Sequence, residues 1–219
     1  MQPYTIQDNM EIKKLVISPH IDDEVLGCGG ILDKNTFVLY CGFDETHIKG
    51  EWVRKRPDTN TRLNELKKVQ SLLKFEYDIL YNKVNHYIEQ ELIGSFEEAI
   101  NRLKPDEIYI PNPSYNQDHR TVYNAAMVAL RPHDLNHFVK KVLIYEEPQV
   151  YLWNNTSREF KPNYFVPINI NKKIKAYKMM ASQVRTFRSP EMLKAMALLR
   201  GGQGNCKYAE GFQIIRWVN

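Results

Sequence analysis

The stretch Lys14–Glu24, KLVISPHIDDE, couples a short apolar run to a dense group of ionisable side chains. Lys14–Ser18 predicts a buried strand, and the residues after it predict a polar loop followed by a helix. Four ionisable residues follow the strand within five positions: His20, Asp22, Asp23 and Glu24. In open α/β sheets, ligands bind outside the carboxyl ends of strands, so a binding site is expected at this place.

Beyond this stretch, apolar runs alternate with segments of helical periodicity. Further strands are predicted at Thr36–Cys41, Glu107–Pro111 and Lys141–Tyr145. Helices are predicted at Arg62–Lys74, Ile88–Leu103, Asp118–Arg131, Lys172–Gln183 and Pro190–Leu199. The polar segment Asp44–Asn60 predicts a long loop, and the part from Tyr151 onward is less regular. The alternation predicts an α/β fold with a doubly wound, mostly parallel, Rossmann-like sheet flanked by helices, in one domain over residues 1–219.

The composition is that of a globular protein. The chain has 219 residues, of which 43% are hydrophobic and 26% are charged, enough for a substantial core. No apolar run is long enough to predict a transmembrane helix, and the polar N-terminus does not predict a secretory signal. Three cysteines without paired spacing (Cys28, Cys41 and Cys206) argue against a disulfide framework. They favour a reducing compartment, so a cytoplasmic location is expected.

The charge balance excludes few classes of binding partner. Thirty basic and 26 acidic residues give a formal net charge of +4. The basic residues are dispersed along the chain, so nucleic-acid binding is not expected. A mild positive excess is typical of an ordinary solvated surface, and it also allows an anionic ligand such as a phosphorylated or nucleotide-linked sugar. The sequence leaves the oligomeric state open, a homo-oligomer included.

The first motif, Pro19–Glu24, has the residue types of a metal site. An imidazole beside carboxylates suits a borderline cation such as zinc. The alternative is a solvated polar turn in which an aspartate caps the next helix. The glycine-rich segment Gly27–Gly30 lacks the G-x-G-x-x-G spacing of a dinucleotide loop, and its acidic neighbours would repel a pyrophosphate. Its small residues indicate close packing of the helix against the sheet.

A second polar motif, Asn116–His119 (NQDH), follows the strand predicted at Glu107–Pro111. If the two strands are neighbours in the sheet, His119 can face His20 and Asp23. Two histidines and one aspartate leave an open position for water, as catalytic zinc sites do. Taken alone, a histidine near a helix start is more typical of a surface or capping residue.

In this order the two motifs resemble those of the PIG-L/LmbE-like family of zinc-dependent N-deacetylases. That family carries a (P/A)-H-P-D-D-E element after its first strand and an H-P-D-H-like element after a later one. Three further stretches resemble family patterns: Arg62–Glu65 (R-x-x-E), Ala176–Gln183 (A-Y…S-Q) and Arg200–Phe212 (R-G…A-E-x-F). The likeness therefore spans most of the chain.

The resemblance implies a zinc site, a general base and a substrate-binding residue. The zinc ligands would be His20, Asp23 and His119, with one ion per chain. Asp22 would be the general base, and Arg62 would bind the substrate. Substrates across the family are mostly N-acetylglucosamine conjugates, so the implied reaction releases acetate and a free amine from a small-molecule, lipid-linked or nucleotide-linked amino sugar. The sequence does not distinguish Zn²⁺ from Fe²⁺ as the ion held in the cell.

Two positions depart from the family pattern. Ile21 replaces a proline, which removes a rigid φ but no chemistry. Asn116 replaces a histidine that in many members is proposed to stabilise the tetrahedral intermediate or to donate a proton, and an asparagine can donate a hydrogen bond but cannot deliver a proton. Either Asp22 makes both proton transfers, another histidine moves in, or the rate is low. The other histidines are His47, His86, His133 and His137. We expect Asp22 in both roles, with Asn116 as a catalytic hydrogen-bond donor.

Asn116 also supports a rival of another class, a catalytically weakened sugar-binding or metal-binding module on the same scaffold. Against it stand the intact ionisable residues His20, Asp22, Asp23 and His119. Among the neighbouring residues, Asp118 is expected to orient a ligand or Asn116, and Glu24 to support His20 or cap the helix. Trp52 and Tyr115 can stack on a sugar ring, with core or rim packing as the alternative.

Overall fold

The computed structural model of the chain describes residues 11–43, 59–148 and 160–219. His47, Trp52 and most of the predicted loop Asp44–Asn60 lie outside these ranges. In chain order the elements are β1 (Lys14–Ser18), α1 (Asp23–Cys28), β2 (Thr36–Phe43), α2 (Thr59–Leu73), β3 (Glu76–Lys83), α3 (Glu89–Leu103), β4 (Glu107–Pro111), α4 (Gln117–Ala129), β5 (Lys141–Tyr145), β6 (Tyr164–Pro167), α6 (Ile170–Met179), the 3₁₀ turn η1 (Ala181–Gln183), α7 (Pro190–Gln203) and β7 (Ala209–Trp217).

The strands form one seven-stranded sheet in the order β3-β2-β1-β4-β5-β7-β6. The first five strands of this order are parallel to their neighbours, whereas β7 runs antiparallel to both β5 and β6. Strands β2 and β3 extend the sheet to one side of β1, and β4 and β5 extend it to the other. This is the doubly wound, mostly parallel sheet that the sequence predicts.

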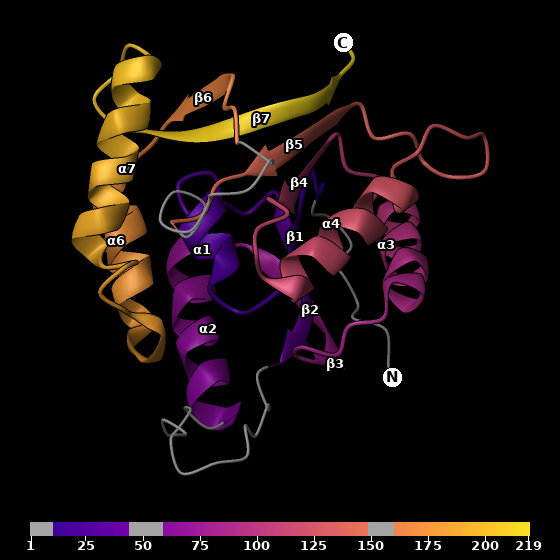
Figure 1. The fold of residues 1–219 in the computed structure, drawn as a ribbon, viewed down its shortest axis with the longest axis horizontal. Helices are drawn as coiled ribbons and strands as arrows, with labels where there is room; N and C mark the ends of the chain where they lie inside the picture. The colour runs from indigo at the N-terminus through magenta and orange to yellow at the C-terminus, as the bar shows by residue number, and fades with distance from the viewer. Residues whose placement is uncertain (1–10, 44–58, 149–159) are drawn as a thin grey trace.

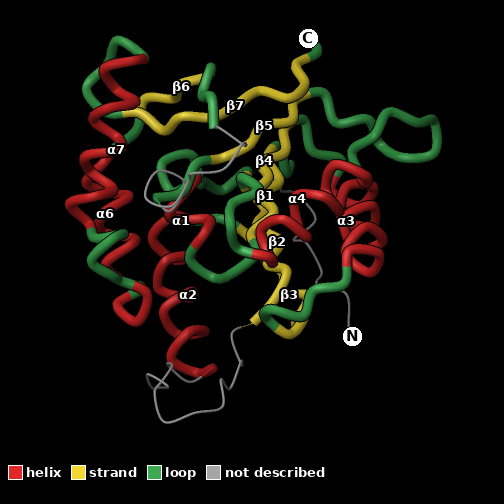
Figure 2. The backbone as a smooth tube through the Cα atoms, viewed as in Figure 1, coloured by secondary structure: helices red, strands yellow, loops and turns green. Residues whose placement is uncertain are grey.

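The centre of the sheet is buried on both faces because helices cover each side (Figures 1 and 2). Helices α1, α2, α6 and α7 lie on one side, and α3 and α4 lie on the other. Successive residues of β1 therefore enter opposite cores: Leu15 and Ile17 pack with α3 and α4, and Val16 packs with α1 and α2. A strand buried on both faces reads as an uninterrupted apolar run, which is why β1, β4 and β5 were predictable from the sequence.

Three strands were not predicted. The edge strand β3 (EYDILYNK) carries charged residues, and only one of its eight positions is fully buried. The four residues of the other edge strand, β6, are all partly buried or exposed. In β7, the buried N-terminal half passes into a half-exposed C-terminal half. Edge positions and half-buried faces weaken the apolar pattern on which a sequence prediction depends.

The glycines of the first motif allow close packing, as the sequence predicts. A Cβ on Gly27 of α1 would lie 2.2 Å from the Cδ2 atom of Tyr145, at the end of β5. The Tyr145 hydroxyl in turn donates a hydrogen bond to the Ile17 carbonyl of β1, at 3.1 Å. A larger residue at position 27 would therefore push α1 away from the sheet.

A buried ion pair ties the C-terminal part of the chain to the end of α1. The Nζ atom of Lys173 (α6) lies 2.6 Å from the Oε1 atom of Glu210 (β7), and both side chains are almost fully buried. The same ammonium donates to the Leu26 carbonyl at 2.8 Å, and the same carboxylate accepts from the Gly30 amide at 2.7 Å. These contacts fix the helix that begins at the first motif.

Replacing Glu210 with alanine should destabilise the fold by about 3–5 kcal/mol, because the Lys173 ammonium is then buried without its counter-charge. Urea unfolding measures the change. The matched control is Lys141→Ala, which breaks the partly exposed pair with Glu107 and should cost about 0.2–1 kcal/mol. Equal small losses in the two variants would show that the buried pair does not hold the fold together.

Candidate functional site

The two sequence motifs lie side by side because β1 pairs with β4 in parallel. The loop after β1 carries His20, and α4, which follows β4, begins with Gln117, Asp118 and His119. The strand order also reverses direction between β1 and β4, which makes this a topological switch point. Ligand sites of open α/β sheets lie at such points, outside the carboxyl ends of the strands.

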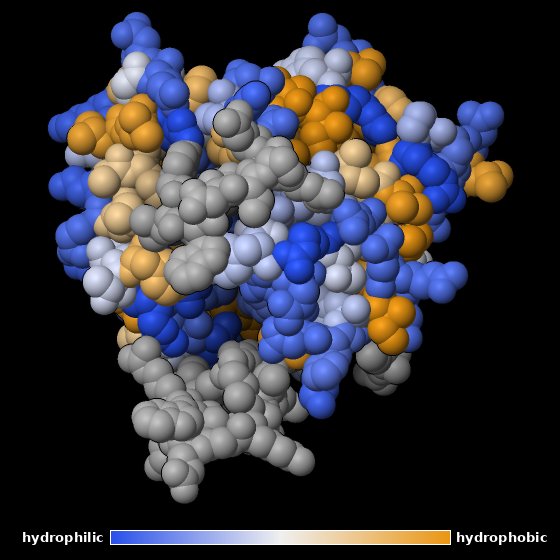
Figure 3. Space-filling view, in the orientation of Figure 1, coloured by the Kyte–Doolittle hydropathy of each residue, from blue (hydrophilic) through white to orange (hydrophobic). Residues whose placement is uncertain are grey.

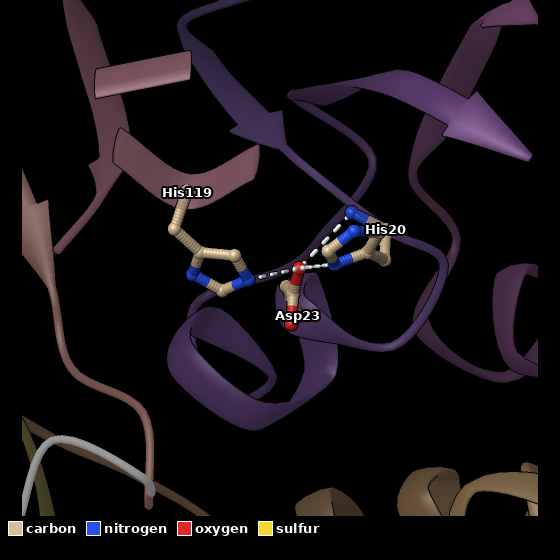
Figure 4. Close-up of side chains that lie close together, drawn as sticks. All are labelled: His20, Asp23 and His119. Atoms are coloured by element: carbon tan, nitrogen blue, oxygen red, sulfur yellow. Dashed lines mark hydrogen bonds and ion pairs between the residues drawn. The ribbon is translucent and has the colours of Figure 1, made fainter. Parts of the chain in front are cut away.

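His20, Asp23 and His119 converge on one point (Figure 4). The Oδ2 atom of Asp23 lies 3.1 Å from Nδ1 of His20 and 3.3 Å from Nε2 of His119. One ligand atom from each residue falls within 4.8 Å of the other two, so these residues form a group that can hold a metal ion. Two imidazoles and one carboxylate are a donor set that zinc and related divalent ions accept while keeping a position open.

The second ring nitrogen of each histidine faces a carboxylate. The Nε2 atom of His20 lies 2.9 Å from Oδ2 of Asp118, as expected for a residue that orients a ligand. The Nδ1 atom of His119 lies 3.4 Å from Oε1 of Glu147. The first of these contacts is a hydrogen bond and the second is at ion-pair distance only. Carboxylates beside the second nitrogen fix the tautomer and orientation of metal-binding histidines, so the surroundings of the donor set also fit a metal ion.

Sequence analysis missed Glu147, although a signal for it exists. Glu146 and Glu147 directly follow β5, at the same edge of the sheet as the two motifs. The rule that singled out the ends of β1 and β4 therefore also applies to the end of β5.

The electrostatics of the group favour a bound cation. Burial opposes the charged form of His20, but hydrogen bonds to Asp118 and Asp23 outweigh it and raise the pKa of His20 to about 10. Burial likewise opposes ionisation of Asp23, yet the two histidines hold the pKa of Asp23 well below its usual range. Burial, followed by the charges of Asp23 and Asp22, raises the pKa of Glu147 well above its ordinary value. Buried carboxylates this close together need positive charge beside them.

Asp22, which lies between His20 and Asp23 in the first motif, has a strained backbone. Its φ is 152° and its ψ is −26°, a conformation that favours glycine. It occupies the N-cap position of α1, but its side chain makes no capping hydrogen bond. Instead, its Oδ2 atom lies 2.9 Å from Nη1 of Arg188. Capping, the alternative for this motif, therefore does not explain the Asp22 side chain.

The peptide bond before Asp22 is held at both ends. The Asp22 amide donates to Oε2 of Glu24 at 2.9 Å, and a guanidinium nitrogen of Arg62 donates to the Ile21 carbonyl. Glu24 therefore contacts the Asp22 backbone through this hydrogen bond. Burial and the neighbouring Asp22 charge raise the pKa of Glu24 to about 8.

A pocket of about 250 Å³ opens over this group. Its lining residues are His20, Asp22, Asp23, Arg62, Val84, Asn85, Tyr115, Asn116, His119, Gln183, Phe187 and Arg188. The predicted ligands, base, hydrogen-bond donor and substrate-binding residue all line this one pocket, including Arg62, which is 3% exposed. Tyr115 is 51% exposed, so the structure places it at the rim and not in the core. Near the centre of the face shown in Figure 3, the described residues that are visible are mainly hydrophilic.

Asn116 is the N-cap residue of α4, and its side-chain oxygen accepts a hydrogen bond from the Asp118 amide at 2.9 Å. The histidines proposed as substitutes for it do not line this pocket in the part of the chain that the structure describes. His133 and His137 lie instead beside Asn136 and the Pro105 carbonyl. His86 is exposed, and His47 lies outside the described ranges.

The sequence analysis also missed the C-terminal wall of the pocket. Gln183, Phe187 and Arg188 come from the segment after α6. The R-x-x-E and S-Q patterns meet here, because Ser182 donates to Glu65 from its amide (2.8 Å) and from its hydroxyl (2.5 Å). This contact brings the C-terminal segment against α2, beside the first motif.

Residues 15–130 match the protein family described as PIG-L: GlcNAc-PI de-N-acetylase. The match covers more than half of the chain and contains both motifs and Arg62. The chain belongs to the PIG-L family. The resemblance given by the motifs is thereby confirmed. The C-terminal wall of the pocket lies outside the matched residues.

Solved structures share the fold over nearly the whole chain. The N,N'-diacetylchitobiose deacetylase of Pyrococcus horikoshii is 22% identical with a TM-score of 0.74, covering 94% of this chain and 84% of that one. GalB, the 4-carboxy-2-hydroxymuconate hydratase of Pseudomonas putida KT2440, is 21% identical with a TM-score of 0.74, covering 95% and 98%. The A40926 pseudoaglycone deacetylase Dbv21 is 16% identical with a TM-score of 0.70, covering 95% and 99%. At these identities the likeness is one of fold.

A search of the curated proteins found no match to this chain. Within residues 11–43, 59–148 and 160–219, none of the helices combines the length and the apolar character needed to cross a membrane.

Replacing Glu147 with leucine should weaken zinc affinity about 10- to 100-fold, because His119 loses the carboxylate that lies beside its second nitrogen. Glu147→Gln keeps an acceptor oxygen and should cost less. His119→Ala should cost more than either change, because it removes one of the three donors. Competition with a chromophoric chelator measures all three affinities. An unchanged affinity in Glu147→Leu would show that Glu147 does not support the site.

Proposed function

We propose that this protein is a zinc-dependent N-deacetylase that removes an acetyl group from an N-acetylglucosamine-type conjugate, releasing acetate and a free amine. The observation that carries the proposal is the position of Asp22. Its carboxylate lines the same pocket as the donor group of His20, Asp23 and His119, yet it is not a member of that group. A base beside a metal centre is the arrangement that metal-assisted amide hydrolysis requires.

The three donor residues would hold the zinc ion, which supplies an acidified water and polarises the amide carbonyl when it is bound. Asp22 would take a proton from the attacking water and pass it to the departing amine, so that one carboxylate serves both transfers. The Asn116 side-chain oxygen is engaged by the Asp118 amide. Its NH₂ group is therefore the part that would donate to the developing oxyanion.

The pocket supports an amino-sugar substrate. Its volume of about 250 Å³ suits a single sugar ring, and polar side chains dominate the lining. Arg62 gives one of its five N–H donors to the Ile21 carbonyl, so its remaining donors would bind sugar hydroxyls or a phosphate. The family to which the chain belongs carries the name of a de-N-acetylase acting on an N-acetylglucosamine conjugate. Two of the deacetylases with this fold, from Pyrococcus horikoshii and the A40926 pathway, also support the reaction class.

Two other functions have specific support. The fold is shared with a hydratase, GalB. Asn116 stands where many family members have a histidine and cannot deliver a proton, as expected of a weakened sugar-binding or metal-binding module. The deciding assay is acetate release from N-acetylglucosamine in free, nucleotide-linked, lipid-linked and thiol-linked form. Binding of these sugars without acetate release would favour the module, and water addition to an unsaturated acid would favour the hydratase.

Replacing Asp22 with asparagine should lower acetate release about 10²- to 10⁴-fold, because the side chain keeps its shape but can no longer accept a proton. The variant should still bind zinc. Asp23→Asn is the matched control and should lose metal affinity together with activity. Near-normal turnover in Asp22→Asn would refute the proposed base, and loss of metal from it would place Asp22 among the ligands.

Replacing Asn116 with histidine should lower activity, because the ring displaces a side chain that caps α4 and donates to the oxyanion. Loss of the cap should also destabilise the protein by about 0.5–2 kcal/mol. Asn116→Asp separates the two effects, since it keeps the capping oxygen but removes the donor. It should lose turnover without losing stability, as followed by acetate release and thermal unfolding. A gain of activity in Asn116→His would instead indicate a weakened member of the family.

A further inference from the structure

One wall of the pocket is formed by residues 183–188, which we call the strap. Three of its residues line the pocket: Gln183, Phe187 and Arg188. The strap lies beyond residues 15–130, the part that matches the family. Its contribution to the site is therefore separate from that of the two motifs.

The backbone of the strap is anchored to two helices. The hydroxyl of Tyr177, a fully buried residue of α6, lies 3.2 Å from the Gln183 carbonyl and 2.7 Å from the Arg188 carbonyl. Just before the strap, Ser182 is bound to Glu65 of α2. A β-bridge within the strap draws its two halves together. These contacts fix where the Arg188 side chain begins.

The Arg188 guanidinium is directed onto Asp22. The Nη1 atom of Arg188 lies 2.9 Å from Oδ2 of Asp22, and their side chains are 14% and 4% exposed. The Nη2 atom lies 3.4 Å from Oε1 of Gln183, within the same strap. Burial of such a pair gives little net stability, because desolvation offsets the attraction. Its main effect is geometric, since a guanidinium held from both sides fixes the carboxylate that it contacts.

Different residues hold the backbone and the side chain of Asp22. Glu24 and Arg62 bind the peptide before it and so stabilise its strained φ. They leave the torsions of the Asp22 side chain unrestrained. The contact with Arg188 restrains those torsions, because it ties one carboxylate oxygen to the strap.

We propose that Arg188 is a positioning residue, which holds the Asp22 carboxylate in the orientation that proton transfer in the pocket requires. This inference rests on the proposed function of Asp22 as the base. A proton-transfer group must lie within hydrogen-bond distance of its partner, and a displacement of about 1 Å can cost about 10²-fold in rate. Arg188 thereby links the position of the strap to proton transfer by Asp22, without itself exchanging a proton.

Steady-state kinetics of Arg188→Gln test the proposal. We expect kcat for acetate release to fall about 10²-fold with KM and zinc content unchanged, because the reacting geometry is lost and the binding contacts are kept. Methylguanidinium in the assay should restore part of kcat. The control Arg131→Gln removes an exposed arginine and should behave as wild type. A rise in KM with kcat unchanged would make Arg188 a substrate contact, and loss of zinc would make it a support of the metal group; either result overturns the proposal.

Two further variants test the proposal if Arg188→Gln fails to fold. Arg188→Lys keeps the charge but loses the planar fork, and Tyr177→Phe removes the hydroxyl that anchors the strap. Both should fold, as judged by thermal unfolding, and both should lose kcat without losing zinc. Unchanged kcat in both would overturn the proposal.

Crystal structures of the zinc-loaded wild type and of Arg188→Gln give a result that does not depend on turnover. We expect the Asp22 carboxylate to leave its wild-type orientation in the variant. An unchanged orientation overturns the positioning role, even if the wild type deacetylates sugars. A displaced carboxylate in a protein that releases no acetate from any N-acetylated sugar would support the positioning role and refute the proposed function.

Discussion

The parallel pairing of β1 with β4 is the constraint on which the site depends. It places the loop after β1 beside the first turn of α4, so that two histidines nearly 100 residues apart in sequence, His20 and His119, approach one oxygen of Asp23. The pairing is itself secured by apolar residues that alternate between two cores. Hydrophobic burial therefore sets where the strand ends lie, because they cannot shift without disrupting both cores. Polar contacts then hold the side chains within the site.

The chemistry of the site depends on several carboxylates that this fixed geometry holds close together. Asp22, Asp23, Glu24 and Glu147 are buried together, and a guanidinium, an imidazole or a backbone amide lies against each of them. The arginines Arg62 and Arg188 come from α2 and from the strap and approach the same loop. A divalent ion among the donor atoms would complete this balance. Structure and function thus share one requirement, positive charge at the carboxyl edge of the sheet.

The sequence predicted the features that lie within short segments and the strands that are buried on both faces of the sheet. The strands at Lys14–Ser18 and Glu107–Pro111 were predicted with the bounds that the structure gives them, because central parallel strands are apolar throughout. The group of His20, Asp23 and His119 was predictable since its residues lie in two short motifs after those strands. Arg188 was not, because it reaches Asp22 only through the anchoring of the strap by Tyr177 and Glu65. Contacts made by tertiary packing between distant segments leave no periodic signal in one sequence.

The backbone of Asp22 has a consequence for how this protein can change. Its φ of 152° is one that glycine adopts without strain, whereas an aspartate there costs on the order of 1–3 kcal/mol. Substitution by glycine would therefore relieve backbone strain in the very step that removes the carboxylate and leaves Arg188 without its partner. The position lies on a trade-off between thermodynamic stability and activity. Where the relieved strain exceeds the cost of the lost ion pair, engineering for heat resistance that scores unfolding alone would select a well-folded protein without the proposed base.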